Sequence, residues 1–215
     1  MSKKAVIFDL DGVIVSTDEY HYRAWKRLCE EEGIPFSREI NERLRGVSRV
    51  ESLDLILKGA AQVYSPEAKE ELAARKNRYY VQLLQLLTPA DILPGVTALL
   101  QELKDRGVGC AIGSSSKNTP FILEKIGLGG FFDAVADGNQ IRRSKPDPEV
   151  FLLAAEKLGL RAEQCVVVED AEAGIEAALA AGMKAAAVSA AAHYPGAHVR
   201  GADLREIGVG QLLQD

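Results

Sequence analysis

Two aspartates stand directly after the first apolar run of the chain. Residues 5–8 read as a buried strand, and Asp9 and Asp11 follow it one residue apart, just before Gly12. Carboxylates are seldom buried unless they are paired or bind a metal. An ionised aspartate can attack phosphorus or hold a hard cation, and a second one beside it can transfer protons. The pair therefore predicts a reactive strand end within a magnesium and phosphate site.

Three further segments carry groups that such a site requires. Ser114–Asn118 follows a second apolar run, and its hydroxyl and N–H groups suit a phosphate. Lys145 can neutralise a phosphoryl oxygen as a point charge. Glu169 and Asp170 follow another apolar run and, with Asp9, can hold Mg²⁺ through carboxylate oxygens. Because ligands bind at the carboxyl ends of strands in an open parallel sheet, we expect these segments to converge there.

Each of these segments also has an ordinary structural explanation. Asp9–Gly12 could form a turn or a calcium loop, and Ser114–Ser116 could simply cap a helix. Lys145 could be an exposed loop residue, and Glu169–Asp170 a solvated helix cap. Four such explanations at successive strand ends are jointly improbable, so the combination favours a catalytic site.

The rest of the chain predicts how these groups are positioned. Apolar, strand-like runs recur at residues 108–112, 134–136, 165–168 and 185–188. Helical stretches at 96–104, 119–126, 148–158 and 171–181 alternate with them. Continuous apolar strands that alternate with helices are typical of a parallel sheet covered on both faces. We therefore expect an α/β fold with a Rossmann-like parallel sheet core.

The stretch from about residue 15 to residue 88 interrupts this alternation. It contains no convincing strand and four amphipathic helical stretches, at 19–32, 38–44, 51–57 and 66–87. A helical block of this size after the first strand predicts an inserted helical cap subdomain. We place the core domain at residues 1–15 and 90–215, and the cap domain at residues 16–89.

Bulk composition argues against several classes of protein. The 215 residues carry a net charge of −5 and no basic stripe, so we expect no nucleic-acid partner. No apolar stretch approaches the roughly 20 residues that cross a bilayer, and the first residues show no signal-peptide pattern. The three cysteines are widely spaced and form no metal-binding pattern, which predicts a protein of the reducing cytoplasm.

Taken together, the four motifs resemble those of the haloacid dehalogenase superfamily, with a helical cap after the first strand. The resemblance covers essentially the whole chain, and longer stretches narrow it to the β-phosphoglucomutase family. These stretches are residues 19–25, 46–49, 75–77, 89–91 and 116–118. The resemblance implies a magnesium-dependent phosphomutase of carbohydrate metabolism that interconverts β-D-glucose 1-phosphate and β-D-glucose 6-phosphate. Such an enzyme becomes a phosphoprotein at its aspartate and is primed by β-glucose 1,6-bisphosphate.

The resemblance also implies which residues carry out the chemistry. Asp9 would be the nucleophile, and Asp11 would protonate and deprotonate the sugar oxygen. Thr17 and His21, at the hinge, would position Asp11 as the cap closes. The residues expected to bind one Mg²⁺ are Asp9, Asp11, Glu169 and Asp170.

Two phosphate pockets are implied as well. Ser114 and Lys145 would hold the transferring phosphate, while Arg49 and Lys117 would clamp the distal one between the domains. The residues expected to bind substrate are Gly46, Val47, Arg49, Ser52, Lys76, Ser115, Ser116, Lys117 and Asn118. On residue type alone, Arg49 and Lys76 would also suit a solvated helix face. The chain departs from the family pattern at Val15-Ser16, at Arg45 and at Ala171.

Two other functions remain open at this point. A magnesium-dependent phosphatase of small sugar phosphates or phosphoglycolate would share Asp9, Asp11, Lys145 and Asp170. A non-catalytic binding module would make the nucleophile dispensable, and the intact site argues against it. A monomer is expected, because cap motion requires a cap free of neighbours.

Overall fold

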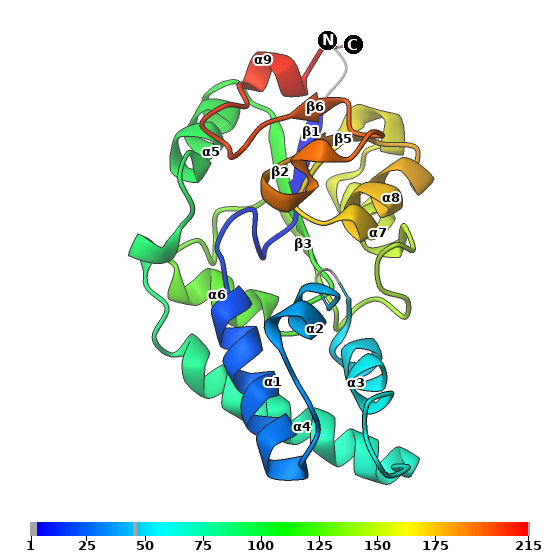
Figure 1. Cartoon of the computed structure of the whole chain (residues 1–215). Coiled ribbons are helices and arrows are strands. Elements are labelled where there is room, and N and C mark those ends of the chain that lie inside the picture. Colours follow the sequence, from blue (N-terminus) through cyan, green and yellow to red (C-terminus); the bar gives the residue numbers. More distant parts are fainter. Residues whose placement is uncertain (1–3, 45–46, 215) are drawn as a thin grey trace.

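A computed structural model describes residues 4–44 and 47–214 of the chain. Within these ranges six parallel strands form one sheet in the order β3-β2-β1-β4-β5-β6 (Figure 1). The strands are β1 (Ala5–Phe8), β2 (Gly109–Gly113), β3 (Ala134–Ala136), β4 (Cys165–Glu169), β5 (Lys184–Ala187) and β6 (Val199–Arg200). Because the chain runs outward from the central β1 in both directions, the ligand crevice is expected at the carboxyl ends of β1 and its neighbours.

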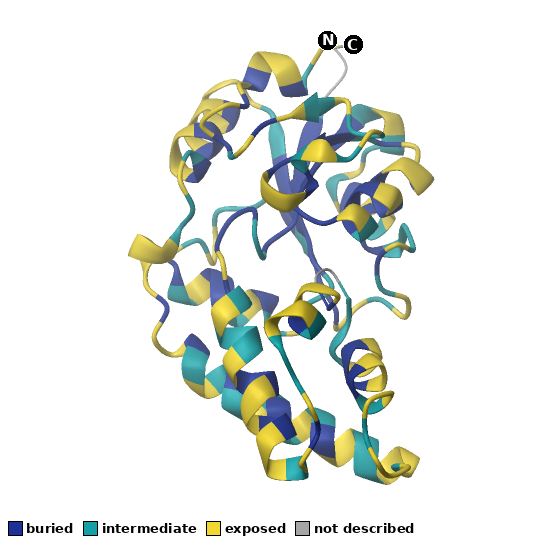
Figure 2. Ribbon diagram, in the orientation of Figure 1, coloured by how far each residue is buried: buried dark blue, intermediate teal, exposed yellow. Residues whose placement is uncertain are grey.

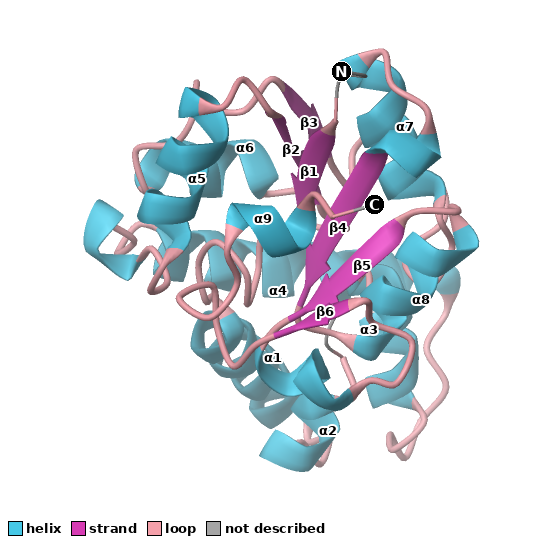
Figure 3. Ribbon diagram, turned by 90° about the horizontal axis from the view of Figure 1, so that it is seen from above, coloured by secondary structure: helices cyan, strands magenta, loops and turns pink. Residues whose placement is uncertain are grey.

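Alternate residues of β1 point to opposite faces of the sheet, and helices cover both faces (Figure 3). Val6 and Phe8 belong to an apolar cluster with residues of α5, α6 and α9, whereas Ala5 and Ile7 pack with α7 and α8. These helices are α5 (Val96–Asp105), α6 (Thr119–Lys125), α7 (Glu149–Leu158), α8 (Glu172–Ala180) and α9 (Val209–Leu212). The predicted α/β fold with a doubly covered parallel sheet is confirmed.

Four helices between β1 and β2 form the inserted helical cap, which lies beyond the carboxyl ends of the strands (Figure 1). They are α1 (Asp18–Glu32), α2 (Arg38–Glu42), α3 (Arg49–Leu57) and α4 (Pro66–Leu84). The cap has its own apolar core, which includes Trp25, Leu28, Leu53 and Leu72. Its outer helix faces are exposed (Figure 2). No helix in residues 4–44 and 47–214 is long and apolar enough to cross a membrane.

Some element boundaries differ from those expected. Helix α4 ends at Leu84 rather than Leu87, and Pro89 disfavours helical backbone at the residue before it. Helix α7 starts one residue later than predicted, and the carboxylate of Asp147 accepts a bond from the Glu149 N–H at 3.0 Å. Strand β6 was not predicted, because two edge residues carry no periodicity. Short 3₁₀ turns complete the chain at η1 (Pro89–Asp91), η2 (Ala162–Gln164) and η3 (Ser189–His193).

Candidate active site

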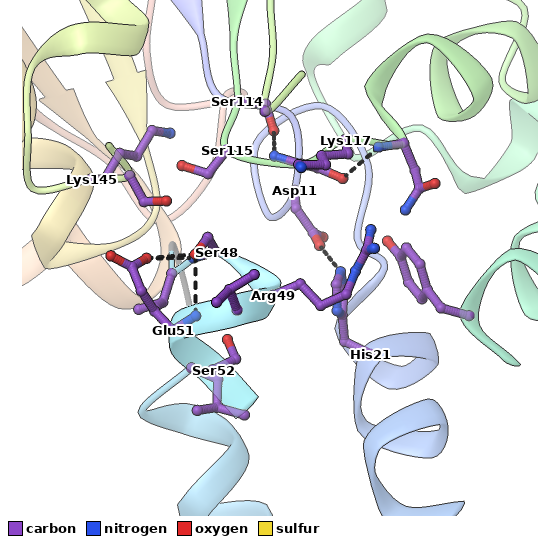
Figure 4. A pocket seen from close by; sticks show the side chains of 18 of the residues that line it. Asp11, His21, Ser48, Arg49, Glu51, Ser52, Ser114, Ser115, Lys117 and Lys145 are labelled. Carbon is purple, nitrogen blue, oxygen red and sulfur yellow. Dashed lines mark hydrogen bonds and ion pairs between the residues drawn. The ribbon is translucent and has the colours of Figure 1, made fainter. Parts of the chain in front are cut away.

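A cavity of about 430 Å³ lies between the carboxyl ends of the strands and the cap. Figure 4 shows Ser114, Ser115 and Lys145 from the core facing Arg49 and Ser52 from the cap. The predicted site residues that line it are Asp9, Asp11, His21, Val47, Arg49, Ser52, Lys76, Ser114, Ser115, Ser116, Lys117, Asn118, Lys145, Glu169 and Asp170. Thr17 lies behind them in contact with Asp11, and Gly46 and Arg45 lie outside the described residues.

The core wall of the cavity is centred on a buried lysine between two carboxylates. The Nζ atom of Lys145 lies 2.5 Å from Asp9 Oδ1 and 2.5 Å from Glu169 Oε1. The same ammonium lies 4.6 Å from the ring centroid of Phe151, which packs beneath it. All four residues are buried. Asp9 is therefore held at the mouth of β1 with its charge balanced by a fixed cation.

Burial changes how these groups ionise. The pKa of Asp9 is raised to about 7, and burial is the largest cause. The charge of Lys145 lowers this pKa, and the charge of Glu169 raises it. Burial also disfavours the Lys145 ammonium, but the two carboxylates outweigh it and raise the pKa of Lys145. Lys145 is thus a permanent positive charge, suited to a phosphoryl oxygen or to a carboxylate. A divalent cation beside Asp9 would favour its ionised form.

Three carboxylates could hold that cation. Asp9, Glu169 and Asp170 each offer an oxygen, and these oxygens lie within 4.8 Å of one another. Buried oxygen ligands are the donor set that Mg²⁺ prefers, so the residues fit this ion. Glu169 is fixed by two N–H donors, those of Asp170 at 2.8 Å and Ala171 at 2.9 Å. The side chain of Ala171 is therefore not needed to orient the ligand.

A glycine makes room for the third carboxylate. Gly12 has a φ of +84°, and a Cβ atom built on it would lie 2.1 Å from Asp170 Oδ2. Only glycine allows both this backbone conformation and this close approach. The Gly12 of the opening motif thus shapes the space that Asp170 occupies.

The loop after β2 forms a row of polar groups along the cavity. Ser114 is buried, and its hydroxyl oxygen accepts a bond from the Ser116 N–H at 3.2 Å. The Oγ atom of Ser115 is buried and has no hydrogen-bond partner among the described residues. Asn118 donates from Nδ2 to Asn77 Oδ1 of α4 at 3.0 Å, which joins this loop to the cap. The loop can therefore offer hydroxyl and amide donors to a phosphate.

The carboxylate of Asp11 is bonded to Thr17 and does not belong to the group of three carboxylates. Its Oδ1 accepts from the Thr17 N–H at 2.7 Å, and its Oδ2 lies 2.5 Å from Thr17 Oγ1. His21 Nε2 is 3.6 Å from the same Oδ2 (Figure 4). The structure places Asp11 with its predicted hinge partners, whereas its role as a metal ligand stays a prediction.

The cap wall carries two basic side chains, Arg49 and Lys76, beside the acidic Asp18 and Glu51. Ser48 caps α3 in a reciprocal bond with Glu51, which places Arg49 in the first turn at the cavity. Lys76 is 1% exposed, and its Nζ lies 4.7 Å from the ring centroid of Trp25 and 2.9 Å from His21 Nδ1. Burial and the charge of Arg49 lower the pKa of Lys76, and stacking on aromatic faces partly offsets that cost.

The ring of His21 lies between Lys76 and Asp11. Burial, with Lys76 and Arg49 nearby, lowers the pKa of His21 well below its ordinary value. When Lys76 donates to Nδ1 of His21, the proton of the neutral ring lies on Nε2. That proton faces Asp11 Oδ2. His21 can therefore donate toward the carboxylate that is expected to move protons.

Two aromatic residues of the site were missed as site residues. Trp25 belongs to the cap core and also lines the cavity, and Tyr80 lines it as well; sequence analysis gave neither a role in the site. Trp25 follows His21 by four residues and Tyr80 follows Lys76 by four, so each pair shares one helix face. That spacing is the feature of the sequence that could have pointed to them.

Comparison with known proteins places the chain in a family. A model described as haloacid dehalogenase-like hydrolase matches residues 3–182. A β-phosphoglucomutase of Bacillus subtilis is 49% identical over 182 residues, covering 84% of this chain and 80% of the relative. A phosphorylated carbohydrates phosphatase of Thermotoga maritima is 32% identical over 184 residues, covering 84% of this chain and 82% of the relative.

A solved structure agrees with these relatives. The crystal structure of a β-phosphoglucomutase from Clostridium difficile superposes with a TM-score of 0.92 at 38% identity, covering 96% of this chain and 94% of its own. The fold and the resemblance inferred from the motifs are both confirmed. The chain is an enzyme that belongs to the haloacid dehalogenase-like hydrolase family.

Proposed function

We propose that this enzyme is a phosphomutase that interconverts β-D-glucose 1-phosphate and β-D-glucose 6-phosphate. The observation that carries the proposal is the presence of cations on both walls of one cavity. Lys145 lies on the core wall, whereas Arg49 and Lys76 lie on the cap wall. A bisphosphate intermediate must present either end to Asp9, so its other phosphate needs a second anion pocket. A phosphatase of monophosphates needs only the first pocket.

In the proposed reaction Asp9 and Asp11 divide the chemistry. An Asp9 oxygen forms a bond to phosphorus of β-glucose 1,6-bisphosphate while the bond from phosphorus to the sugar oxygen breaks. Asp11 gives its proton to that leaving oxygen. Glucose 6-phosphate leaves, and the aspartyl-phosphate transfers its phosphoryl group to the free 6-hydroxyl of an incoming β-glucose 1-phosphate, whose proton Asp11 takes. Each cycle regenerates the bisphosphate and exchanges the two sugar monophosphates.

The remaining side chains hold and neutralise the phosphates. Lys145 and the Ser114 hydroxyl would bind the phosphoryl group at Asp9, next to the N–H groups of the same loop. Mg²⁺, held by Asp9, Asp170 and Glu169, would neutralise charge on the phosphoryl oxygens when bound. Closure of the cap would exclude water, which favours a sugar hydroxyl as acceptor.

Substrate contacts on the cap side would fix the distal end of the sugar. Arg49 and Lys117 come from opposite walls and would clamp the distal phosphate. Ser52 and Lys76 are buried polar groups at the cavity and would contact the sugar hydroxyls. Ser116 and Asn118, on the loop after β2, would complete the pocket for the distal phosphate. These roles rest on the positions of the residues and on the resemblance to β-phosphoglucomutases.

Hydrolysis of sugar monophosphates is the second candidate function. The 32% identical phosphatase of Thermotoga maritima is its main support, because the match covers 84% of this chain. The core wall alone would serve such a reaction. The two functions therefore differ in the use of the cap wall.

One assay separates the two functions. The enzyme is given β-glucose 1-phosphate, Mg²⁺ and a trace of the 1,6-bisphosphate, and both glucose 6-phosphate and free phosphate are followed. We expect glucose 6-phosphate to form with little phosphate release. Rapid release of phosphate without glucose 6-phosphate would contradict the mutase and support the phosphatase.

We further infer a monomer that works in the cytoplasm. Cys29, Cys110 and Cys165 are all free and buried, which suits a reducing compartment. A cap that opens and closes at every turnover is best accommodated in a monomer. Size-exclusion chromatography with light scattering would test the oligomeric state directly.

A further inference from the structure

Tyr80 of α4 is buried, and its contacts go to residues that surround Asp11. Its hydroxyl lies 2.7 Å from Thr17 Oγ1. Its ring lies against His21 with 4.0 Å between the centroids and a tilt of 37°, and Nζ of Lys76 lies 4.5 Å from the ring centroid. At 1% exposure, the side chain has no room to turn toward solvent. One side chain thus touches Thr17, His21 and Lys76 together.

The direction of the hydrogen bond between Tyr80 and Thr17 follows from the third partner. The Thr17 hydroxyl has one proton, and its oxygen lies 2.5 Å from Asp11 Oδ2. An ionised carboxylate can only accept, so Thr17 donates to Asp11. The phenol must then donate to Thr17 Oγ1. Burial raises the pKa of Tyr80 well above its ordinary value, which keeps that proton in place.

We propose that Tyr80 is a positioning residue for Asp11, acting through the hydroxyl of Thr17. The phenol donates to the hydroxyl oxygen of Thr17. The proton of the Thr17 hydroxyl is then used for the bond to Asp11. Because Thr17 precedes α1 and Tyr80 lies on α4, this chain of two bonds ties both long cap helices to the orientation of Asp11. A hydrogen bond donated to Thr17 also polarises its hydroxyl and strengthens the next bond in the chain.

The inference depends on the proposed function only in giving Asp11 the acid and base role, which a phosphatase would share. It adds a residue, 63 positions away from Thr17, that touches neither the metal group nor the core phosphate loop through the bonds described above. A purely structural Tyr80 would stabilise the packing of α1 on α4 and leave turnover by the folded enzyme unchanged.

A double-mutant cycle tests this role. Tyr80→Phe keeps the ring contacts with His21 and Lys76 and removes only the hydroxyl. We expect kcat of the folded enzyme to fall about tenfold with KM within about twofold, the effect of one lost polar interaction. In a Thr17→Val background, where the intermediate hydroxyl is absent, the same change should lower kcat by less than about twofold. In a Thr17→Ser background the full dependence on Tyr80 should return.

The matched control is Tyr79→Phe. Tyr79 is the preceding residue of α4, and its hydroxyl donates to Glu31 at 2.7 Å on the exposed side of the helix. We expect its kcat to equal that of the wild type. Thermal unfolding of every variant gives the folded fraction to which kcat is referred. An unchanged kcat in Tyr80→Phe, or an equal loss in the wild-type and Thr17→Val backgrounds, would overturn the inference.

The role of Tyr80 can be tested whether or not the enzyme is a mutase. If the wild type releases phosphate and forms no glucose 6-phosphate, the mutase is rejected, and the same cycle is measured on hydrolysis. Coupling between Tyr80 and Thr17 in that reaction would still support the positioning role. Its absence would reject the role whichever reaction the enzyme catalyses.

Discussion

The two walls of the cavity carry positive charge in different ways. On the core wall, Lys145 lies 2.5 Å from each of two carboxylates, so its ammonium is already paired before any substrate binds. On the cap wall, the ammonium of Lys76 lies against the rings of Trp25 and Tyr80 and beside a neutral His21. The lysine of the core wall is therefore neutralised within the protein, whereas Lys76 and Arg49 of the cap wall are suited to receive negative charge from a ligand.

This difference suggests how the work is divided. On the core wall, the carboxylates of Asp9, Glu169 and Asp170 lie at the ends of buried strands, and such positions are rigid enough to hold a nucleophile and a metal. The cap wall consists of long side chains on helices that belong to a separate apolar cluster. We infer that the core wall sets the chemistry and that the cap wall selects the acceptor of the phosphoryl group.

The strongest test of the core wall is Asp9→Asn. The amide has the same shape but cannot act as the nucleophile, so we expect both isomerisation and hydrolysis to fall by more than about 10³-fold. Rates of glucose 6-phosphate formation and phosphate release measure the two reactions. The matched control is Asp137→Asn, a buried aspartate after β3 that accepts from the Asn139 N–H at 2.8 Å. Activity near that of the wild type in Asp9→Asn would remove the nucleophile from the core wall.

A second test of the core wall uses a glycine. Gly12→Ala would place a Cβ atom 2.1 Å from Asp170 Oδ2 at a φ of +84°, so Asp170 must move. We expect activity to fall about 100-fold and stability to fall by about 2 kcal/mol. The control is Gly33→Ala in the cap, where φ is +65° but no atom lies within 4 Å of the new Cβ. It should lower stability by about 1 kcal/mol with activity retained.

Enzyme assays and urea unfolding distinguish the two glycine variants. If Gly12→Ala and Gly33→Ala lose stability equally and both keep their activity, then the close approach of Gly12 to Asp170 has no functional importance. The core wall would then be less rigid than the comparison with the cap wall requires.

The cap wall is tested by Arg49→Ala. Removing a charge-assisted contact to the distal phosphate should lower kcat/KM for isomerisation about 30- to 100-fold. Hydrolysis of a small monophosphate should change less than about threefold, because it needs only the core wall. Arg78→Ala removes another cap arginine, one that pairs with Glu71 on the exposed face of α4, and should change neither reaction. Equal losses in isomerisation and hydrolysis would argue against a dedicated distal phosphate pocket.

The core wall could be predicted from the sequence far better than the cap wall. The strand at Ala5–Phe8 and the polar residues at the strand ends are local patterns, and a parallel sheet brings such ends to one edge. The contact between Tyr80 and Thr17 instead depends on how two helices pack across 63 residues of separation. No local pattern determines that packing.

The role of Asp11 shows a second limit. Its position beside Asp9 suggested both metal binding and proton transfer, because residue type and spacing suit either. The structure directs its carboxylate to Thr17, a contact set by the backbone turn after β1 rather than by residue type. Backbone direction at a strand end is not encoded in the apolar pattern, so the sequence left both roles open.

The smallest expected effect concerns strain next to the core wall. Ser189 follows β5 with a φ of +51°, in the left-handed region that favours glycine, and Ala191 two residues later donates to the Asp170 carbonyl at 3.0 Å. Ser189→Gly relieves this strain but also gives the unfolded chain more conformational freedom, which opposes the gain. We therefore expect the free energy of unfolding to rise by about 0.5 kcal/mol and Tm by roughly 1–2 °C. Activity should not change, because the exposed Ser189 side chain lies outside the cavity.

The control for this last prediction makes the same substitution where the backbone is unstrained. Ser65 caps α4 at a φ of −68°, and its hydroxyl oxygen accepts from the Ala68 N–H at 3.2 Å. Ser65→Gly should therefore lower Tm, because it removes a cap and relieves no strain. Opposite shifts in the two variants, measured by calorimetry, would assign the gain at Ser189 to its backbone. A fall in Tm for both would mean that the loop beside Asp170 carries no strain, and that the core wall is as relaxed as the cap.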